Sequence, residues 1–423
     1  MLEKPKLFLS AKEFWLVVTI LVAFIAIRFL FLYQEYQGFV QKPFYYTEVD
    51  VLQQYSKTKN GRTYTVLRLY SNSLGLSFFT RTYRQDNLLD KRVRLKLFPS
   101  KRIGFIDYLS AFYIRSEINA VSNKAETFKS VVLNHIAKQH DYPMIAQFYQ
   151  AIFLANPLPK ELRESISKLG ISHLIALSGF HLAILSTALF FLFKPLYRYF
   201  QQRYFPYRFD LIDLGFIVLV VLGVYVWFVN APDSLLRSYM MMVVGWLVLI
   251  AGVELISFGF LAVVVILLLA LVPKMLFSLA FWFSVLGVFY IFLLLHYFRG
   301  LKSYWMSLVI SIGVFVLMLP IVHIFFPVTS MAQLYSPILS LGFTLFYPLS
   351  TVLHLIGFGG LFDTQLIALF TLEDKMIDIS VPMFYGLAYI AISLLAIYSR
   401  WFFYLLLITA VVVMGWMFIP FML

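Results

Sequence analysis

Long hydrophobic runs fill most of the chain after residue 172. A helix that crosses a bilayer needs about 20 mostly apolar residues, and runs of about that length lie at 173–193, 211–229, 236–251, 255–272, 276–297, 304–325, 333–356, 381–398 and 401–420. Residues 14–32 form one more. The pattern therefore predicts about ten membrane spans. Pro337 and Pro348 interrupt one of these runs, so we expect a broken or re-entrant helix at 333–356.

A different pattern occupies residues 40–102. Short runs such as "TYTVLRLYS" and "KRVRLKLF" alternate apolar and polar positions, and "KTKNGR" carries an Asn-Gly turn signal. Roughly five antiparallel strands in about 60 residues are typical of a small closed barrel of the OB type. A period of two predicts a core face and an opposite charged face in the last run, made respectively of Val93, Leu95, Leu97 and of Arg92, Arg94, Lys96.

Residues 103–170 favour helices that lie along the membrane surface. An apolar stripe over 104–142, with Ile106, Leu109, Phe112 and Tyr113, indicates an amphipathic helix. Short helices broken at "NPLP" follow. The predicted organisation is an N-terminal transmembrane helix (1–36), an OB-like β domain (40–102), interfacial helices (103–170) and a polytopic α-helical membrane domain (171–423).

Composition agrees with an integral membrane protein. Hydrophobic residues make up 61% of the 423 residues and charged residues 13%, whereas soluble domains are about half apolar and a quarter charged. The chain has no cysteine, which excludes disulfides and cysteine-based metal sites. Lys4, Lys6 and Lys12 precede the first span. They predict a cytoplasmic N-terminus and an extracytoplasmic 34–170 region.

Positive charge is concentrated in the predicted β domain. Thirteen Lys and Arg stand against four acidic residues between Val40 and Arg102, which gives +9 of the chain's net +13. Single-stranded nucleic acid binds basic grooves with aromatic platforms. We therefore expect a DNA-binding surface made of Lys57, Lys59, Arg62, Arg68, Arg81, Arg84, Arg92, Arg94, Lys96, Tyr64 and Tyr70. The alternative is a solvated basic surface that contacts anionic lipid headgroups.

Polar groups interrupt the apolar run "HLIALSGFHLAIL" at 173–185. On a regular helix His173, Ser178 and His181 share one side, and Gly179 lets another backbone approach. Polar groups at membrane depth face a cavity or a partner. Three interpretations stay open: the histidines bond to other helices, Ser178 and His181 form a nucleophile and base, or these groups line a hydrophilic path.

A second polar interruption, "NAPDSLLRSYMMM", begins another span. Asn230, Pro232 and Asp233 are helix-start residues, and Arg237 follows Asp233 by four positions, so the two can pair. Either Arg237 snorkels to the interface beside that aspartate, or its guanidinium binds phosphate at the mouth of a path. Ser278 and Trp282 lie in a third run, where ordinary helix packing is an alternative to lining the path.

These motifs, in this order, resemble the ComEC-type competence proteins. "HLIALSGFHLAIL" resembles the family's His-Leu-Leu-Ala-(Ile/Val)-Ser-Gly-Leu-His signature, with Phe180 at the last leucine. "PDSLLRSYMM" and "PKMLFSLAFWFSVLGV" resemble two further family segments. The helix, loop and helix before the signature also match, although the family's Leu-Leu-Leu-Gly-Asp is "IFLAN" here.

The resemblance implies an inner-membrane channel that carries one DNA strand into the cytoplasm during natural transformation. It assigns motif positions to His173, Ser178, Gly179, His181 and Arg237. The expected partners are single-stranded DNA, membrane lipids, a periplasmic DNA receptor and a cytoplasmic motor or single-strand-binding protein, with a homo-oligomer possible in principle. Many family members add a metallo-β-lactamase-like nuclease domain.

We expect neither enzyme activity nor a cofactor in this chain. The sequence has no His-x-His-x-Asp-His cluster and no Gly-x-x-x-x-Gly-Lys-(Ser/Thr) loop, so another polypeptide would degrade the second strand and supply the energy. Two other functions stay open. One is an intramembrane serine hydrolase that uses Ser178 and His181, and the other is a transporter of a small anionic or lipid-linked substrate.

Overall fold

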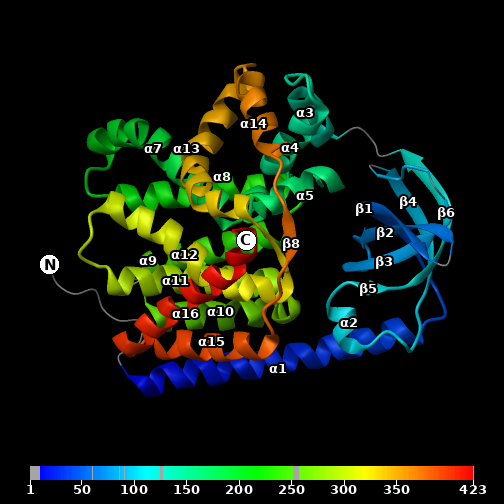
Figure 1. Ribbon diagram of the computed structural model, residues 1–423, viewed down its shortest axis with the longest axis horizontal. Helices are drawn as coiled ribbons and strands as arrows, with labels where there is room; N and C mark the ends of the chain where they lie inside the picture. The colour runs from blue at the N-terminus through cyan, green and yellow to red at the C-terminus, as the bar shows by residue number, and fades with distance from the viewer. Residues whose placement is uncertain are drawn as a thin grey trace. The chain divides into compact units, whose positions relative to one another are not determined.

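The computed structural model describes residues 10–59, 61–84, 86–89, 91–123, 127–250 and 257–422. The chain divides into two compact units (Figure 1). One, called the β unit here, contains residues 8–128 together with 263–281. The other, called the membrane unit, contains 129–262 and 282–423. Each unit is described by itself.

A six-stranded sheet forms most of the β unit (Figure 1). Its strands are β1 (Tyr45–Lys59), β2 (Arg62–Ser71), β3 (Leu76–Thr82), β4 (Lys91–Phe98), β5 (Phe112–Tyr113) and β6 (Arg115–Asn123), in the spatial order β5-β3-β2-β1-β4-β6. All neighbours are antiparallel except β3 and β5. β1 joins β2 through Gly61, whose φ of 72° is the left-handed conformation that glycine tolerates.

The two faces of the sheet differ as alternation predicts. Val93, Leu95 and Leu97 of β4 are completely buried, whereas Arg92 and Arg94 are exposed and Lys96 is partly exposed. Val49, Leu67, Leu69 and Phe78 bring the same core to the neighbouring strands. The predicted division of this strand into a core face and a charged face is confirmed.

The last two strands bring the edges of the sheet together. β5 pairs in parallel with β3, and β6 pairs with β4 at the other edge. The hydroxyl oxygens of Thr80 on β3 and Ser116 on β6 lie 2.7 Å apart. The prediction of a helix throughout 104–142 is wrong at 112–123, because these residues complete the sheet. Of the described residues in 104–142, those of α2 (Phe105–Leu109) and α3 (Phe128–Ala137) are helical.

Aromatic contacts attach the first helix to the sheet. α1 (Ala11–Gln41) places Phe39 against Tyr45, with ring centroids 5.2 Å apart, and against Tyr108 of α2 at 5.4 Å. The Tyr36 hydroxyl donates to the Ile103 carbonyl oxygen at 2.8 Å. Lys274 of η1 (Pro273–Phe277) lies 5.7 Å from the Tyr108 ring. These contacts give the β unit one continuous core.

Apolar helices dominate the membrane unit. They are α7 (Gly179–Tyr204), α8 (Asp210–Phe228), α9 (Asp233–Ile250), α10 (Phe258–Leu271, shared with the β unit), α11 (Leu279–Tyr297), α12 (Ser303–Phe325), α13 (Ser336–Leu355), α15 (Met383–Leu395) and α16 (Arg400–Phe418), which is followed by η4 (Ile419–Phe421). Within the described residues of the whole chain, seven helices are long and apolar enough to cross a membrane, and four apolar helices are shorter. The chain is thus a helical membrane protein with a β domain, and ten spans stay a prediction.

The signature run is not one helix. α6 (Ser172–Ile175) ends before Ser178, and α7 begins at Gly179. The predicted span 173–193 is therefore displaced: the membrane-length helix is 179–204. His173 and His181 do not lie on one side of a single helix, because they belong to two helices. Ser178, an extended residue with φ −139° and ψ 179°, lies between these helices.

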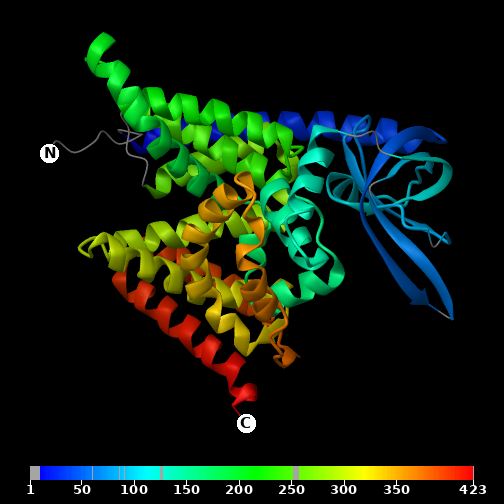
Figure 2. The same ribbon diagram turned by 90° about the horizontal axis from the view of Figure 1, so that it is seen from above.

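The remaining elements pack around this break. α14 (Asp363–Phe370) contacts both α4 (Pro143–Leu154) and α5 (Lys160–Lys168), and both ribbon views place the orange α14 beside the teal α4 (Figure 2). A strand pair, β7 (Val328–Ser330) with β8 (Met376–Asp378), joins the two ends of the segment that contains η2 (Met331–Tyr335), α13, η3 (Gly359–Phe362) and α14. Pro348 is accommodated within α13, which remains helical from 336 to 355.

Candidate functional site

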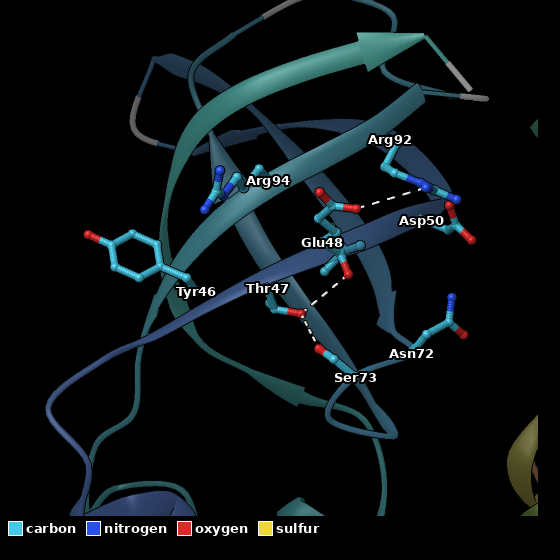
Figure 3. A pocket seen from close by; sticks show the side chains of 9 residues that line it. Tyr46, Thr47, Glu48, Asp50, Asn72, Ser73, Arg92 and Arg94 are labelled. Carbon is cyan, nitrogen blue, oxygen red and sulfur yellow. Dashed lines mark hydrogen bonds and ion pairs between the residues drawn. The ribbon is translucent and has the colours of Figure 1, made fainter. Parts of the chain in front are cut away.

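A polar cavity opens on the charged face of the sheet. It has a volume of about 560 Å³ and lies where β1 and β4 pair (Figure 3). The Arg92 guanidinium lies 3.8 Å from a Glu48 carboxylate oxygen, and Arg94 is directly opposite Glu48 in the strand register. Tyr46 lines the same cavity. Two exposed arginines and one phenol ring provide contacts for phosphate and for a base.

An aromatic platform with associated cations adjoins the cavity. The Lys96 ammonium lies 4.5 Å from the Phe44 ring centroid, 5.8 Å from that of Tyr46 and 5.3 Å from that of Phe98. Arg115 of β6 lies 5.5 Å from the Phe98 ring. Phe44 and Tyr46 are 43% and 53% exposed, which leaves ring surface for a base. We call Phe44, Tyr46, Lys96, Phe98 and Arg115 the aromatic platform.

A second group of rings and cations lies on the strands at the other edge. Arg68 approaches the Phe79 ring at 5.9 Å, and Phe79 stacks on Tyr113 at 5.3 Å. Lys57 lies 5.6 Å from the Tyr55 ring. Partial burial, followed by a hydrogen bond with Tyr55, raises the pKa of Tyr113. Tyr113 therefore remains a neutral phenol at neutral pH.

The other predicted DNA-binding residues are mostly accessible. Tyr64 and Tyr70 are on the same β2 face as Arg68, since residues two apart share a face, and both are partly exposed. Arg81 and Arg84 are exposed at the end of β3 and after it. The side chains of Lys59 and Arg62 lie outside the described part of the structure.

The signature histidine His181 is sealed among helices. Its Nδ1 accepts a hydrogen bond from the Ser178 main-chain N–H at 3.3 Å and lies 3.4 Å from the Ser178 hydroxyl. The ring meets Phe343 and Tyr347 of α13 edge-on, at centroid distances of 5.2 and 4.8 Å. The side chain is completely buried. Since Nδ1 accepts, Nε2 carries the hydrogen of the neutral ring.

α7 begins in close contact with α9. The Ser234 hydroxyl donates to the Leu177 carbonyl oxygen at 2.5 Å, and the Ser238 hydroxyl donates to the Ser234 carbonyl oxygen at 3.0 Å. A Cβ atom on Gly179 would lie 2.8 Å from the Ser238 hydroxyl oxygen. A side chain at position 179 would therefore require Ser238 to shift, and the predicted close approach of another backbone to Gly179 stays a prediction.

The remaining motif residues of this region occupy different environments. His173 Nε2 lies 3.4 Å from the Ser340 hydroxyl of α13, and Arg237 on α9 is only 3% exposed. Asn230 and Ala231 adopt left-handed φ values of 66° and 45° just before α9. The side chain of Asp233 is outside the described residues, so its pairing with Arg237 stays a prediction.

Ser278 and Trp282 fall on opposite sides of the division between the units. Ser278 accepts a hydrogen bond from the Phe281 main-chain N–H at 3.3 Å and so caps the start of α11. The Trp282 ring is 37% exposed. A channel-lining role for either residue stays a prediction.

Several residues of these sites are absent from the sequence-based set. Phe44 and Phe98 lie at the ends of alternating runs, and Tyr46 continues the alternation of β1, so the period of two could have found them. Phe343 and Tyr347 contact His181 from a segment far away in sequence. No local pattern indicates that contact.

Comparison with known proteins identifies most of the membrane unit. A family model described as competence protein matches residues 155–422. The match includes the signature, Arg237 and α13. No curated protein and no solved structure matches the chain.

Proposed function

Because the chain belongs to the competence protein family, whose role is in DNA uptake during competence, we propose that it is a channel that carries single-stranded DNA across the inner membrane. The exposed arginines and the aromatic platform on one face of the sheet carry this proposal. Cations beside accessible rings suit a chain of phosphates and unstacked bases. Tyr46 lies at the cavity and beside Lys96, where a base can stack on the ring while its phosphate meets a cation.

The strand connections favour an OB-type barrel for the capturing domain. β1, β2 and β3 form a meander, and β4 pairs with β1. β5 and β6 act as one strand that is interrupted at Ile114: its first part pairs with β3 and its second part with β4. A closed five-stranded barrel with these neighbours is the OB arrangement. OB barrels bind oligonucleotides on the strand face that carries rings and cations.

Charge at the helix ends supports the proposed orientation. Lys194, Arg198 and Arg203 lie in the second half of α7, and Arg208 follows in the loop to α8. Arg299 and Lys302 lie between α11 and α12. Under the positive-inside rule these loops are cytoplasmic. The β domain is then extracytoplasmic, where it meets incoming DNA, and the N-terminus is cytoplasmic.

The burial of His181 and Arg237 requires that the conducting state differ from this one. Neither side chain reaches a wet path while it is covered to this degree. The conformation described here is therefore the closed state in our proposal. In the open state Arg237 and the polar groups around Ser178 contact the phosphates at membrane depth.

The geometry does not favour the hydrolase alternative. A catalytic histidine needs one nitrogen for the serine and the other for an orienting group. The His181 Nδ1 already accepts the Ser178 N–H, and within the described residues its buried Nε2 has no hydrogen-bond partner. We propose that this chain is not an enzyme and that a separate motor or gradient drives the strand.

Uptake of labelled DNA by a competent strain tests the proposal. A deletion strain carries the wild type, Arg237→Ala or the control Arg299→Ala, whose side chain lies in a loop. We expect periplasmic entry of DNA in all three and cytoplasmic entry in all except Arg237→Ala. Normal cytoplasmic entry in a well-expressed Arg237→Ala strain would contradict the proposal.

A further inference from the structure

Two adjacent residues hold a whole helical hairpin in the membrane unit. The Gln139 side-chain amide donates to the His354 carbonyl oxygen at 3.1 Å, and its oxygen accepts the Gly359 main-chain N–H at 2.9 Å. His140 contacts both His354 and Asp363. The hairpin consists of α13, the turn at Gly357 with φ 87°, η3 and α14. The contacts of Gln139 and His140 fasten the tip of this hairpin, residues 354–363, to the segment just before α4.

The same hairpin covers the signature. Phe343 and Tyr347 of α13 enclose His181, and Phe343 stacks on Phe180 with centroids 6.1 Å apart. Near the start of α13, the Ser336 hydroxyl donates to the Gly170 carbonyl oxygen at 3.1 Å. His181 can reach a wet path only if α13 moves. The fastening at the tip is thus one of the contacts that keep α13 over the signature, together with the bond from Ser336 to Gly170.

At that fastening, three buried groups form a chain of contacts. The Nδ1 atom of His140 lies 2.9 and 3.1 Å from the two carboxylate oxygens of Asp363, and its Nε2 atom lies 3.0 Å from Nε2 of His354. His354 Nδ1 lies 2.6 Å from the Ser350 carbonyl oxygen. The His140 side chain is completely buried and Asp363 is 8% exposed. Water cannot easily replace a lost contact here.

Each of the three contacts needs one hydrogen. The Ser350 carbonyl only accepts, so His354 Nδ1 carries a hydrogen. One hydrogen must lie between the two imidazoles and one between His140 and the carboxylate. Three hydrogens satisfy the chain. A fourth hydrogen that is added to an imidazole places two N–H groups face to face, and with only two hydrogens one contact joins two acceptors.

Other titratable groups of the described residues surround these three contacts. Tyr149 of α4 stacks on His140 with centroids 4.7 Å apart and planes 9° apart, and burial followed by the charge of Asp363 raises its pKa. Tyr149 thus remains neutral. His135 of α3 interacts electrostatically with His354. Lys138 and Asp141, which are close to His140 in sequence, are exposed. The three contacts thus join Asp363, His140 and His354 directly, with Tyr149 stacked beside them.

We propose that Asp363, His140 and His354 form a proton-controlled latch that closes the hairpin over the signature only within a limited pH range. Acid adds the fourth hydrogen and opens the latch at the contact between the histidines. Alkali removes the third and opens it. As regulation of the channel this rests on the proposed function, whereas the latch itself can be tested without DNA.

Site-specific labelling tests the latch, because the chain contains no cysteine. Ser350→Cys introduces a thiol at a position of α13 that is 1% exposed. The Ser350 hydroxyl that it replaces donates to the Tyr347 carbonyl oxygen of the same helix. A maleimide reacts with this thiol when α13 lifts. Ser393→Cys, 1% exposed on α15, is the buried control, and Tyr398→Cys, 87% exposed, is the accessible control.

Labelling of the full-length protein in detergent should be slowest at an intermediate pH. The measurements should cover the whole pH range in which the detergent-solubilised protein stays folded, so that both the acid limb and the alkaline limb of the labelling profile are reached. Each limb should rise by up to about tenfold per pH unit, as expected when one proton controls the opening. Both control cysteines should follow only the intrinsic reactivity of a thiol with pH.

Two variants separate the limbs. In His354→Gln the amide oxygen accepts from His140 and cannot take up a proton, so the acid limb should disappear. In Asp363→Asn the amide donates to a neutral His140, so the alkaline limb should disappear. A flat wild-type profile, or the loss of the same limb in both variants, would overturn the latch. If labelling follows the predicted pH profile but cytoplasmic DNA uptake does not change with pH, the latch stands and the proposed DNA path is contradicted.

Discussion

The Ser238 hydroxyl oxygen lies 2.8 Å from the position that a Cβ atom would occupy on Gly179. The two residues bring the first turn of α7 against α9 where the signature breaks. Gly179→Ala should therefore force the helices apart and destabilise the protein by about 1–3 kcal/mol, the usual cost of overpacking. Thermal unfolding in detergent measures this change.

The matched rescue is Ser238→Gly, since the Cβ of Ser238 is also within 3.1 Å of that position. The double variant should regain stability relative to Gly179→Ala, apart from the cost of a glycine within α9. Equal melting temperatures for the single and double variants would show that this contact does not limit the approach of α7 to α9.

His181 should tolerate replacements that retain a hydrogen-bond acceptor at Nδ1. His181→Asn keeps an oxygen near the Ser178 N–H, whereas His181→Ala leaves that donor without its acceptor and opens a cavity beside Tyr347. We expect His181→Ala to lose about 2–5 kcal/mol more than His181→Asn. Urea or thermal unfolding distinguishes them. Equal losses would exclude a capping role for the imidazole.

Tyr46→Ala should weaken the binding of single-stranded DNA by roughly 1–3 kcal/mol, the contribution of one stacked base. The ring is exposed at the cavity and beside Lys96. Fluorescence anisotropy with a labelled oligonucleotide measures the affinity of the full-length protein. Tyr142→Ala, with the same 53% exposure but in the membrane unit, is the control. An equal loss in both variants would contradict the platform.

Glu48→Gln should strengthen that binding. Glu48 lies 3.8 Å from Arg92, and both side chains are at least half exposed. Such a pair contributes about 0–1 kcal/mol, so removing the carboxylate should increase affinity up to about fivefold. The salt dependence should become steeper, because Arg92 then meets a phosphate. Glu117→Gln near Arg115, at 4.0 Å, is a matched comparison.

Alternation was the most informative pattern in the chain. It predicted the buried and charged faces of β4 and the antiparallel strands before it, because a period of two directly gives the face of each residue. The strands at 112–123 were missed, because Phe112 and Tyr113 also fit a helical apolar stripe together with Leu109. The pairing of Phe112 with Phe78 of a distant strand decides that segment.

Long-range contacts could not be predicted in the same way. His140 and His354 are more than 200 positions apart and lie in ordinary surroundings in sequence. His181 and Arg237 were conspicuous by type, but their burial depends on how α13 and α9 pack. Periodicity gives the helices of a membrane protein, and packing decides which of their polar groups meet.

The small strand pair β7–β8 constrains how the chain is threaded through the bilayer. Val328 and Asp378 are bonded neighbours, so the polypeptide returns at residue 378 to the place that it left at residue 328. A segment whose two ends meet on one side of a bilayer makes an even number of crossings, or none. We therefore expect that α13 does not supply a single crossing by itself, despite its suitable length. A count of hydrophobic stretches one by one would then misplace the carboxyl end.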